Sequence, residues 1–329
     1  MRLQSLDIKG KIGKRECHEE VSVSFRGCEP WTRRVNADMG SRDQNSSAIN
    51  TMTGTTPDPV SGSVSDSQLA ALFAPAGPRQ SLQALAAWHA EIAGLTQRIS
   101  EPAIGAMRMA WHRDAIADAF AASPVVRRNP LIEGIAQLRD RPGAPTAEAL
   151  IAIIDAHDAD FEGRGFDKLD AMRRHADAGY GAYLRLAARL IDPAQESSGA
   201  LHRAGEVWGI AEMVRAFRYR AARGLAIIPG DVLDMIGLTP ARLASGQDAA
   251  AARQALGAVL DAGADALRAA QSDVRTLPPH LFAAWGHVAL SRGYLKQAAK
   301  ASDPYRSAIV LSPLTKQLTL MKASLTGRL

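Results

Sequence analysis

The stretch AGEVWGIAEMVRAFRYRAARGLAIIP, residues 204–229, decides the fold that the sequence predicts. Its apolar side chains recur at three- and four-residue steps, which places them on one face of a helix. These positions are Val207, Ile210, Ala211, Val214, Phe217 and Ala221. Gly224 ends the periodic pattern, and Pro229 prevents the helix from resuming at once. We therefore predict one long helix that ends in a glycine-containing turn.

Four arginines lie on or beside this predicted helix: Arg215, Arg218, Arg220 and Arg223. A helix this rich in guanidinium groups, set in an apolar chain, requires an anionic ligand or acidic side chains on a neighbouring helix. The sequence leaves both alternatives open. In the second alternative the arginines only stabilise the fold, and their loss would affect no ligand or partner.

The composition favours a helical protein with a sizeable core. The chain has 329 residues, of which 47% are hydrophobic, 22% charged and only 5% aromatic, and its formal net charge is +5. A mild excess of basic residues suits an acidic substrate, an anionic lipid surface or an acidic partner protein. We predict no nucleic-acid partner, because basic runs interleaved with aromatics, zinc-finger spacing and RNA-recognition motifs are all missing from the sequence.

Residues 1–65 differ in character from the rest of the chain. They show no sustained periodicity, and residues 40–65 are rich in Gly, Ser, Thr, Asp and Pro, a composition typical of disorder. We predict a disordered extension or a mis-assigned start, with Met39 or Met52 as the true first residue. The two cysteines, Cys17 and Cys28, both lie in this segment. A cysteine-free domain fits a reducing compartment, so we expect a cytoplasmic protein, or one peripheral on the inner face of a membrane.

Residues 66–329 predict a single all-α domain of eight or more helices, because helical periods alternate with Pro- and Gly-containing breaks. Asp66 is expected to cap the first short helix, and Ser81 to cap the second. Long helices are predicted over residues 167–191 and from Pro278–Pro279 to Leu295. Others are expected near residues 102–120, 131–138, 146–160, 249–270 and 313–325.

Two groups of polar residues are candidate sites for chemistry. Asp155, Asp158 and Glu162 share a helix face and could hold Mg²⁺, but we expect a solvated acidic helix end there. Residues 111–114 join a tryptophan, a histidine, an arginine and an aspartate, for which we expect a packed Trp111 and a surface ion pair. Nucleophile-elbow, Walker A and dinucleotide-binding motifs do not occur, which argues against hydrolases, NTPases and Rossmann enzymes.

Several stretches, in order over residues 66–329, together resemble the squalene/phytoene synthase family. The segment SEP at 100–102, followed by MRMAWHRD at 107–114, is similar to the family pattern SEP…RxxWWR(D/E). ARGLAIIPGDVL at 222–233 resembles ARGRxYLPxDL, and residues 69–92, 292–295 and 311–314 resemble other parts of the family. The resemblance implies an isoprenoid-synthase fold, and enzymes of this family join two prenyl diphosphates using Mg²⁺ held by two Asp-rich motifs.

The sequence departs from the family at both Asp-rich motifs. The first should fall near residues 93–97, where this chain has AGLTQ, and the nearest acid is Glu91. The second falls on residues 215–220, RAFRYR, where Arg215 matches but Ala216, Tyr219 and Arg220 replace the metal-binding acids. Arginine cannot bind Mg²⁺, so we predict no metal ligand and no cofactor.

The resemblance therefore implies two alternatives. The chain looks more similar to a non-catalytic branch, the assembly-factor-like proteins of respiratory complex I, and our first hypothesis is a binding or assembly protein with a protein partner at a membrane. The alternative is an active, Mg²⁺-dependent prenyltransferase that condenses two prenyl diphosphates in isoprenoid biosynthesis. In either case a prenyl diphosphate or a lipid is expected in a central cavity. The candidate anion-binding residues are Arg108, Arg113, Arg215, Arg218, Arg220 and Arg223.

Overall fold

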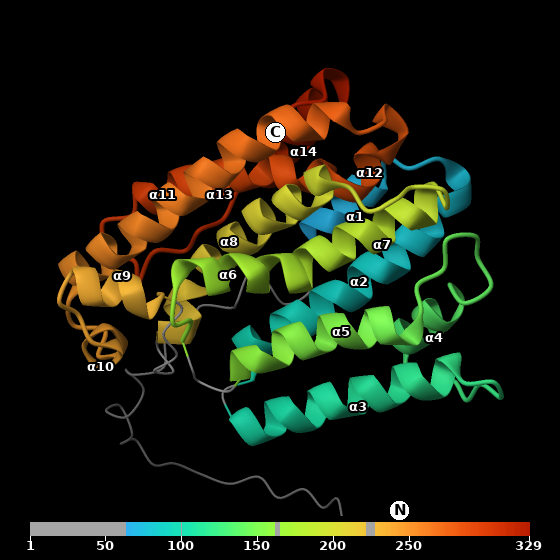
Figure 1. Ribbon diagram of the computed structural model, residues 1–329, viewed down its shortest axis with the longest axis horizontal. Helices are drawn as coiled ribbons and strands as arrows, with labels where there is room; N and C mark the ends of the chain where they lie inside the picture. Colours follow the sequence, from blue (N-terminus) through green and yellow to red (C-terminus); the bar gives the residue numbers. More distant parts are fainter. Residues whose placement is uncertain (1–63, 100, 162–164, 222–227) are drawn as a thin grey trace, which may run out of the picture. The chain divides into compact units, whose positions relative to one another are not determined.

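The structure is a computed structural model that describes residues 64–99, 101–161, 165–221 and 228–329. All of these residues belong to one unit, Pro59–Leu329. They form helices joined by turns, with no strand among them (Figure 1). The predicted all-α fold is confirmed. The disorder and the start site predicted for residues 1–65 concern positions that lie, up to residue 63, outside the described ranges.

The bounds of the helices in these ranges are as follows. The α-helices are α1 (Asp66–Ala71), α2 (Ala76–Arg98), α3 (Pro102–Phe120), α4 (Pro130–Ala136), α5 (Ala147–Asp158), α6 (Leu169–Ala176), α7 (Ala182–Ile191), α8 (Gly199–Ala221), α9 (Gly230–Met235), α10 (Pro240–Ala244), α11 (Ala249–Asp273), α12 (Phe282–Trp285), α13 (Ser291–Ala299) and α14 (Pro313–Thr326). Shorter turns are η1 (Ala159–Phe161), η2 (Asp177–Gly181), η3 (Val274–Thr276), η4 (Pro279–Leu281) and η5 (Gly286–Leu290).

Side-chain caps set several helix starts, and two predicted caps are wrong. The Ser65 side chain, rather than Asp66, caps α1, in a capping box with Gln68. Helix α2 begins at Ala76, five residues before the predicted cap Ser81, which is buried inside the helix. Pro78 does not prevent this start, because the N–H groups of a first helical turn have no partner within the helix.

Two of the predicted helices contain irregular turns. Residues 167–191 form α6 and α7 with a π-helical turn, η2, between them. Residues 278–295, predicted as one helix, are divided among η4, α12, η5 and α13. Gly286 lies at the break between α12 and η5 and packs against the ring of Phe282. A Cβ at Gly286 would lie 2.4 Å from that ring.

Helix α8 is the central helix of the unit, packed against α11, α6, η2 and α13. The predicted apolar face is confirmed, because every one of its six residues is buried. The helix is also buried on sides that the periodicity did not predict. Gly205 and Gly209 face α6 and η2, and a Cβ at Gly205 would lie 2.2 Å from the Cα of Gly181. The two glycines therefore let α8 approach its neighbour at backbone contact.

No helix in the described ranges has the combination of length and apolar character needed to span a bilayer.

Candidate functional site

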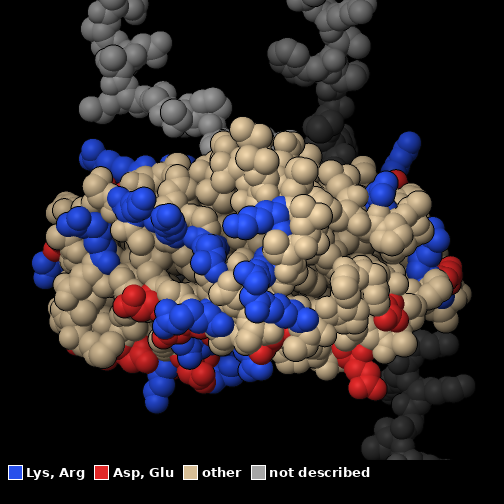
Figure 2. Space-filling view, turned by 90° about the horizontal axis from the view of Figure 1, so that it is seen from above, with Lys and Arg blue, Asp and Glu red and all other residues tan. Residues whose placement is uncertain are grey.

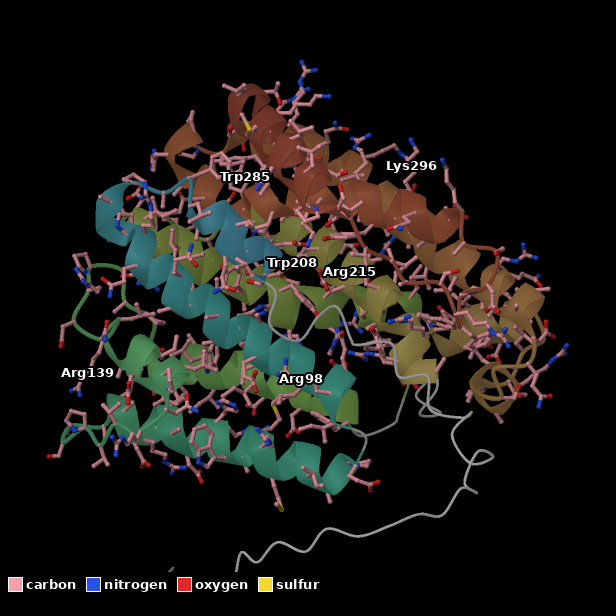
Figure 3. The ribbon with its side chains drawn as sticks, turned by 180° about the vertical axis from the view of Figure 1, so that it is seen from behind. Arg98, Arg139, Trp208, Arg215, Trp285 and Lys296 are labelled. Carbon is pink, nitrogen blue, oxygen red and sulfur yellow. The ribbon has the colours of Figure 1, made fainter. Side chains whose placement is uncertain are left out.

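A cavity of about 510 Å³ lies between α2 and α8. Residues before and at the start of α1, the segment 308–310 and Lys316 of α14 complete its walls. The α2 side includes Glu91, Ala93, Gly94, Gln97 and Arg98, and the α8 side includes Trp208, Glu212, Arg215, Arg218 and Tyr219. Figure 3 shows Trp208 and Arg215 near each other in the interior and Arg98 on α2. Residues 93–97 and 215–220, the two windows compared above with the Asp-rich motifs, thus both contribute to one cavity.

Most charged side chains of the cavity are paired with one another. Arg98 donates to Glu91 at 2.6 Å, and Arg215 donates to Glu212 at 2.6 Å. Arg218 is different: no carboxylate among the described residues lies within ion-pair distance of it, and its guanidinium instead contacts the hydroxyl and ring of Tyr219.

Asp66 connects α1 to three other helices at the edge of the cavity. Its carboxylate accepts the Tyr294 hydroxyl at 2.6 Å, lies 2.8 Å from Lys316 Nζ and 3.8 Å from Arg215 Nη1. Burial by itself raises the pKa of Asp66, but the Arg215 and Lys316 cations outweigh burial and lower this pKa below its ordinary value. Asp66 is therefore ionised at neutral pH, and it ties α1 to α8 and α14.

Aromatic rings and a neutral histidine line the inner end of the cavity. His89 contacts Tyr180, Tyr183 and Trp208 with ring centroids 5.5, 4.7 and 5.2 Å away. Burial lowers the pKa of His89 well below its ordinary value. Its Nε2 has no hydrogen-bond partner among the described residues. The inner end is thus an apolar, uncharged surface with one unused polar atom.

Arg220 lies away from this cavity, in a buried ion pair. It donates to the two carboxylate oxygens of Asp160 at 3.0 and 2.7 Å, and its exposed fraction is 6%. His175 Nε2 lies 3.1 Å and His157 Nδ1 3.7 Å from the same carboxylate. Burial raises the pKa of Asp160, but Arg220 outweighs burial and holds this pKa well below its ordinary value. The Arg220–Asp160 pair is an internal salt bridge that joins α8 to η1.

The structure separates the six predicted anion-binding arginines. Arg215 and Arg218 line the cavity. Arg220 forms an ion pair with Asp160. Arg113 forms ion pairs with Asp155 and Asp158, each at 2.6 Å. Arg108 is exposed on α3. Arg223 lies outside the described residues.

The acidic end of α5, which we expected to be solvated, instead forms ion pairs with an arginine of α3. Asp155 and Asp158 pair with Arg113 and do not line the cavity. Glu162, the third acid of the predicted group, lies outside the described residues. No group of three or more His, Cys, Asp or Glu side chains converges to hold a metal ion anywhere in the described part of the chain.

Sequence reasoning missed several residues of the cavity. Asp66 and Lys316 are 250 positions apart, and no local pattern connects them. Glu212 could have been found, because it precedes Arg215 by three residues and such pairs meet on a helix surface. His89 and Trp208 could be expected in the core of a helical protein, but nothing in the sequence marks them as cavity residues.

A pH-dependent loss of stability is expected from the buried histidines. Burial lowers the pKa of His287 to about 4, so its stabilising contribution is complete above the unfolded-state pKa of about 6.5 and is lost as the pH falls to 4 and below. The full loss for one such histidine is on the order of 3 kcal/mol. Neither ring nitrogen of His287 has a hydrogen-bond partner among the described residues. Urea unfolding of His287→Leu should therefore show a shallower pH dependence between pH 6.5 and 4 than the native chain.

Leucine at Gln254, an exposed position of α11 that does not titrate, serves as the control and should leave the pH dependence unchanged. Equal slopes for native chain and His287→Leu would contradict the burial of a neutral His287.

Comparison with known proteins identifies the family. The family model described as squalene/phytoene synthase matches residues 61–317, which is more than half of the chain. The chain belongs to the squalene/phytoene synthase family. It is also similar to curated relatives named NADH dehydrogenase (ubiquinone) complex I, assembly factor 6. The mouse protein is 25% identical over 237 residues, which cover 70% of this chain and 69% of that protein. The rat protein is 27% identical over 176 residues, covering 53% and 52%, so the match spans about half of its length.

Solved structures of this family share the fold. A dehydrosqualene synthase bound to a ligand has a TM-score of 0.64 at 12% identity, covering 79% of this chain and 90% of that one. Squalene synthase HpnC from Alicyclobacillus acidocaldarius has a TM-score of 0.55 at 13% identity, covering 79% and 88%. At these identities the likeness shows the fold alone, and it confirms the predicted isoprenoid-synthase-like architecture.

Proposed function

We propose that this squalene/phytoene synthase family member is non-catalytic, acts in the assembly of a respiratory complex at a membrane, and binds an anionic amphiphile between α2 and α8. The observation that carries the proposal is the charge pairing in the cavity. Each of its three carboxylates, Glu91, Glu212 and Asp66, is within ion-pair distance of a basic side chain that lines the same cavity.

The charged side chains that line the cavity do not suit a Mg²⁺–diphosphate complex. Mg²⁺ requires near-octahedral coordination by hard oxygen ligands and is bound through carboxylates and substrate phosphates. The three carboxylates that line the cavity are already paired with Arg98, Arg215 and Lys316. Arg218, which has no acidic partner in the described ranges, adds a positive charge that would repel the ion. We therefore derive no reaction step through Mg²⁺.

The same charges favour a ligand with an anionic group. The lining holds four basic side chains, on Arg98, Arg215, Arg218 and Lys316, against three carboxylates. Guanidinium groups bind phosphate and carboxylate oxygens through charge-assisted hydrogen bonds. The aromatic inner end beside His89 and Trp208 offers an apolar surface for a hydrocarbon chain. A prenyl diphosphate and a phospholipid share this chemistry. Binding without a metal would still leave ionisation of an allylic diphosphate difficult.

The named function of the mammalian relatives supports the assembly role. Those proteins are called complex I assembly factors, whereas the solved structures named as synthases share only the fold with this chain. The alternative of a working prenyltransferase is decided by the assays below.

Turnover is the direct assay of the non-catalytic part. The purified full chain, incubated with farnesyl or geranylgeranyl diphosphate and Mg²⁺, is expected to release no squalene- or phytoene-type hydrocarbon. The physical reason is that each carboxylate that the described residues bring to the cavity lies within ion-pair distance of a basic side chain. Extraction and mass spectrometry of the apolar products measure this, with a bacterial squalene synthase as the positive control. Clear product formation would establish the prenyltransferase alternative and refute the proposal.

The assembly role is tested in the organism that supplies the gene. Deleting the gene should lower NADH oxidation by isolated membranes and the amount of intact complex I on native gels, and the native chain should restore both. Glu91→Gln should restore both equally well, because the partly exposed pair with Arg98 contributes only about 0–1 kcal/mol to stability. Unchanged complex I after deletion would refute the assembly role, and failure of Glu91→Gln alone would indicate that a cavity carboxylate has a chemical role.

A further inference from the structure

Helix α14 carries an apolar stripe that nothing in the described residues covers. Leu314, Leu318, Met321 and Leu325 have exposed fractions of 64%, 56%, 54% and 86%. Their spacing of four, three and four residues places them within an arc of about 60° on a helix of 3.6 residues per turn. The buried side chains of the same helix, Leu320 and Ala323, lie on the opposite side. The helix is therefore apolar both toward its own core and outward.

The narrow width of the stripe indicates which kind of surface it fits. Alternating steps of four and three residues are the pattern of a helix–helix seam. A helix that lies on a bilayer has a broader apolar face and many Lys and Arg side chains beside it. Here the stripe is bordered by Thr315, Gln317, Ser324 and Thr326, with Lys322 as the one basic side chain between them. The seam is thus suited to one helix rather than to a lipid surface.

The charge around α14 indicates the chemistry of that helix. From Ser291 to Leu329 the sequence has seven basic residues and a single acid, Asp303. Figure 2 looks down on the side of the unit where α11, α13 and α14 lie in Figure 1, and it shows Lys and Arg spread across this side with Asp and Glu gathered toward one rim. A second copy of the chain would bring the same basic surface against itself, because a two-fold interface pairs identical patches. An acidic partner removes this repulsion.

We propose that the outward face of α14 is a docking site for an amphipathic helix of another protein, with apolar residues at three- and four-residue steps and Asp or Glu beside them. The partner helix would pack along the 14 residues of α14, a length of about 21 Å. Leu318 and Met321 lie at the centre of the contact, and Lys322 provides the charge next to it. The inference does not rest on the assembly role or on the cavity, since a catalytic chain would expose the same stripe.

Site-specific photo-crosslinking in the native organism tests the proposal. The photoreactive residue p-benzoylphenylalanine replaces Leu318 in the full chain, and the crosslinked peptide is sequenced by mass spectrometry. The expected product joins α14 to one other protein, within a segment that has the apolar spacing and acidic neighbours described above. The matched control carries the same residue at Gln254, an exposed polar position of α11, and should not give this product.

Three outcomes would overturn the proposal: a crosslink to a second copy of the chain, a crosslink to lipid, or no product at Leu318 beyond that at Gln254. Two further variants test the charge argument. Lys322→Glu should reduce the crosslink several-fold, whereas Lys322→Arg should preserve it. Lys322 is exposed in the structure, so the melting temperature of each variant should match that of the native chain. An equal crosslink in Lys322→Glu would refute an acidic partner.

Discussion

Arg220→Met is expected to lower the free energy of unfolding by about 3–5 kcal/mol, because it leaves the Asp160 carboxylate buried without its main counter-charge. The pair is bidentate, and both side chains are less than one-tenth exposed. The remaining neighbours, His157 and His175, replace only part of the lost interaction, since burial keeps the pKa of His157 below its ordinary value. Equilibrium unfolding in urea at neutral pH measures the effect.

Arg113 provides a matched control for this experiment. It also donates to two carboxylates, Asp155 and Asp158, each at 2.6 Å, but its side chain is 28% exposed. Water screens such a pair, so Arg113→Met should cost only about 0–1 kcal/mol. The double variant Arg220→Met with Asp160→Asn should recover part of the lost stability, because it removes the isolated charge. Equal losses at Arg113 and Arg220 would contradict the burial of the Arg220–Asp160 pair.

Gly205→Ala is expected to destabilise the unit by about 3 kcal/mol, a large effect for the addition of one methyl group. A Cβ at this position would lie 2.2 Å from Gly181 Cα and 2.5 Å from Gly181 N, both backbone atoms of η2 that no rotamer change can move. Helix α8 would have to separate from η2, which would loosen the contacts around Gly209 as well. The shift of the urea midpoint measures this effect.

Gly257→Ala is the corresponding control on α11. Apart from the backbone of its own helix and its chain neighbours, no atom lies within 4 Å of a Cβ built at Gly257, and alanine is favoured over glycine within a helix by about 1 kcal/mol. This variant should therefore be slightly more stable than the native chain. A neutral Gly205→Ala would mean that α8 and η2 are farther apart than the structure indicates.

The positions of the arginines on α8 also bear on ligand binding. The sequence grouped Arg215, Arg218 and Arg220 as one anion-binding set, and the structure divides that set between a cavity and a core salt bridge. Arg220 is therefore a poor candidate for ligand binding. Arg218 is the better one, because it lines the cavity and no described carboxylate is within ion-pair distance of it.

The sequence by itself determined the helices and their family. Helical periodicity identified the buried face of α8, and α5 begins at Ala147, next to the start that the sequence predicted near residue 146. These features are local, since a helix is defined by side chains three and four residues apart and by hydrogen bonds at its ends. The same local signals misjudged the start of α2, because proline is compatible with a first helical turn.

Only the tertiary structure decided what each charged residue contacts. Asp66 meets Lys316 from the other end of the unit, and Asp160 meets Arg220, 60 positions along the chain. Neighbouring arginines on one helix point in different directions, and which of them is buried depends on the elements that pack there. The uncovered stripe on α14 was likewise decided by packing, because the sequence shows apolar residues on two sides of that helix and the fold covers one of them.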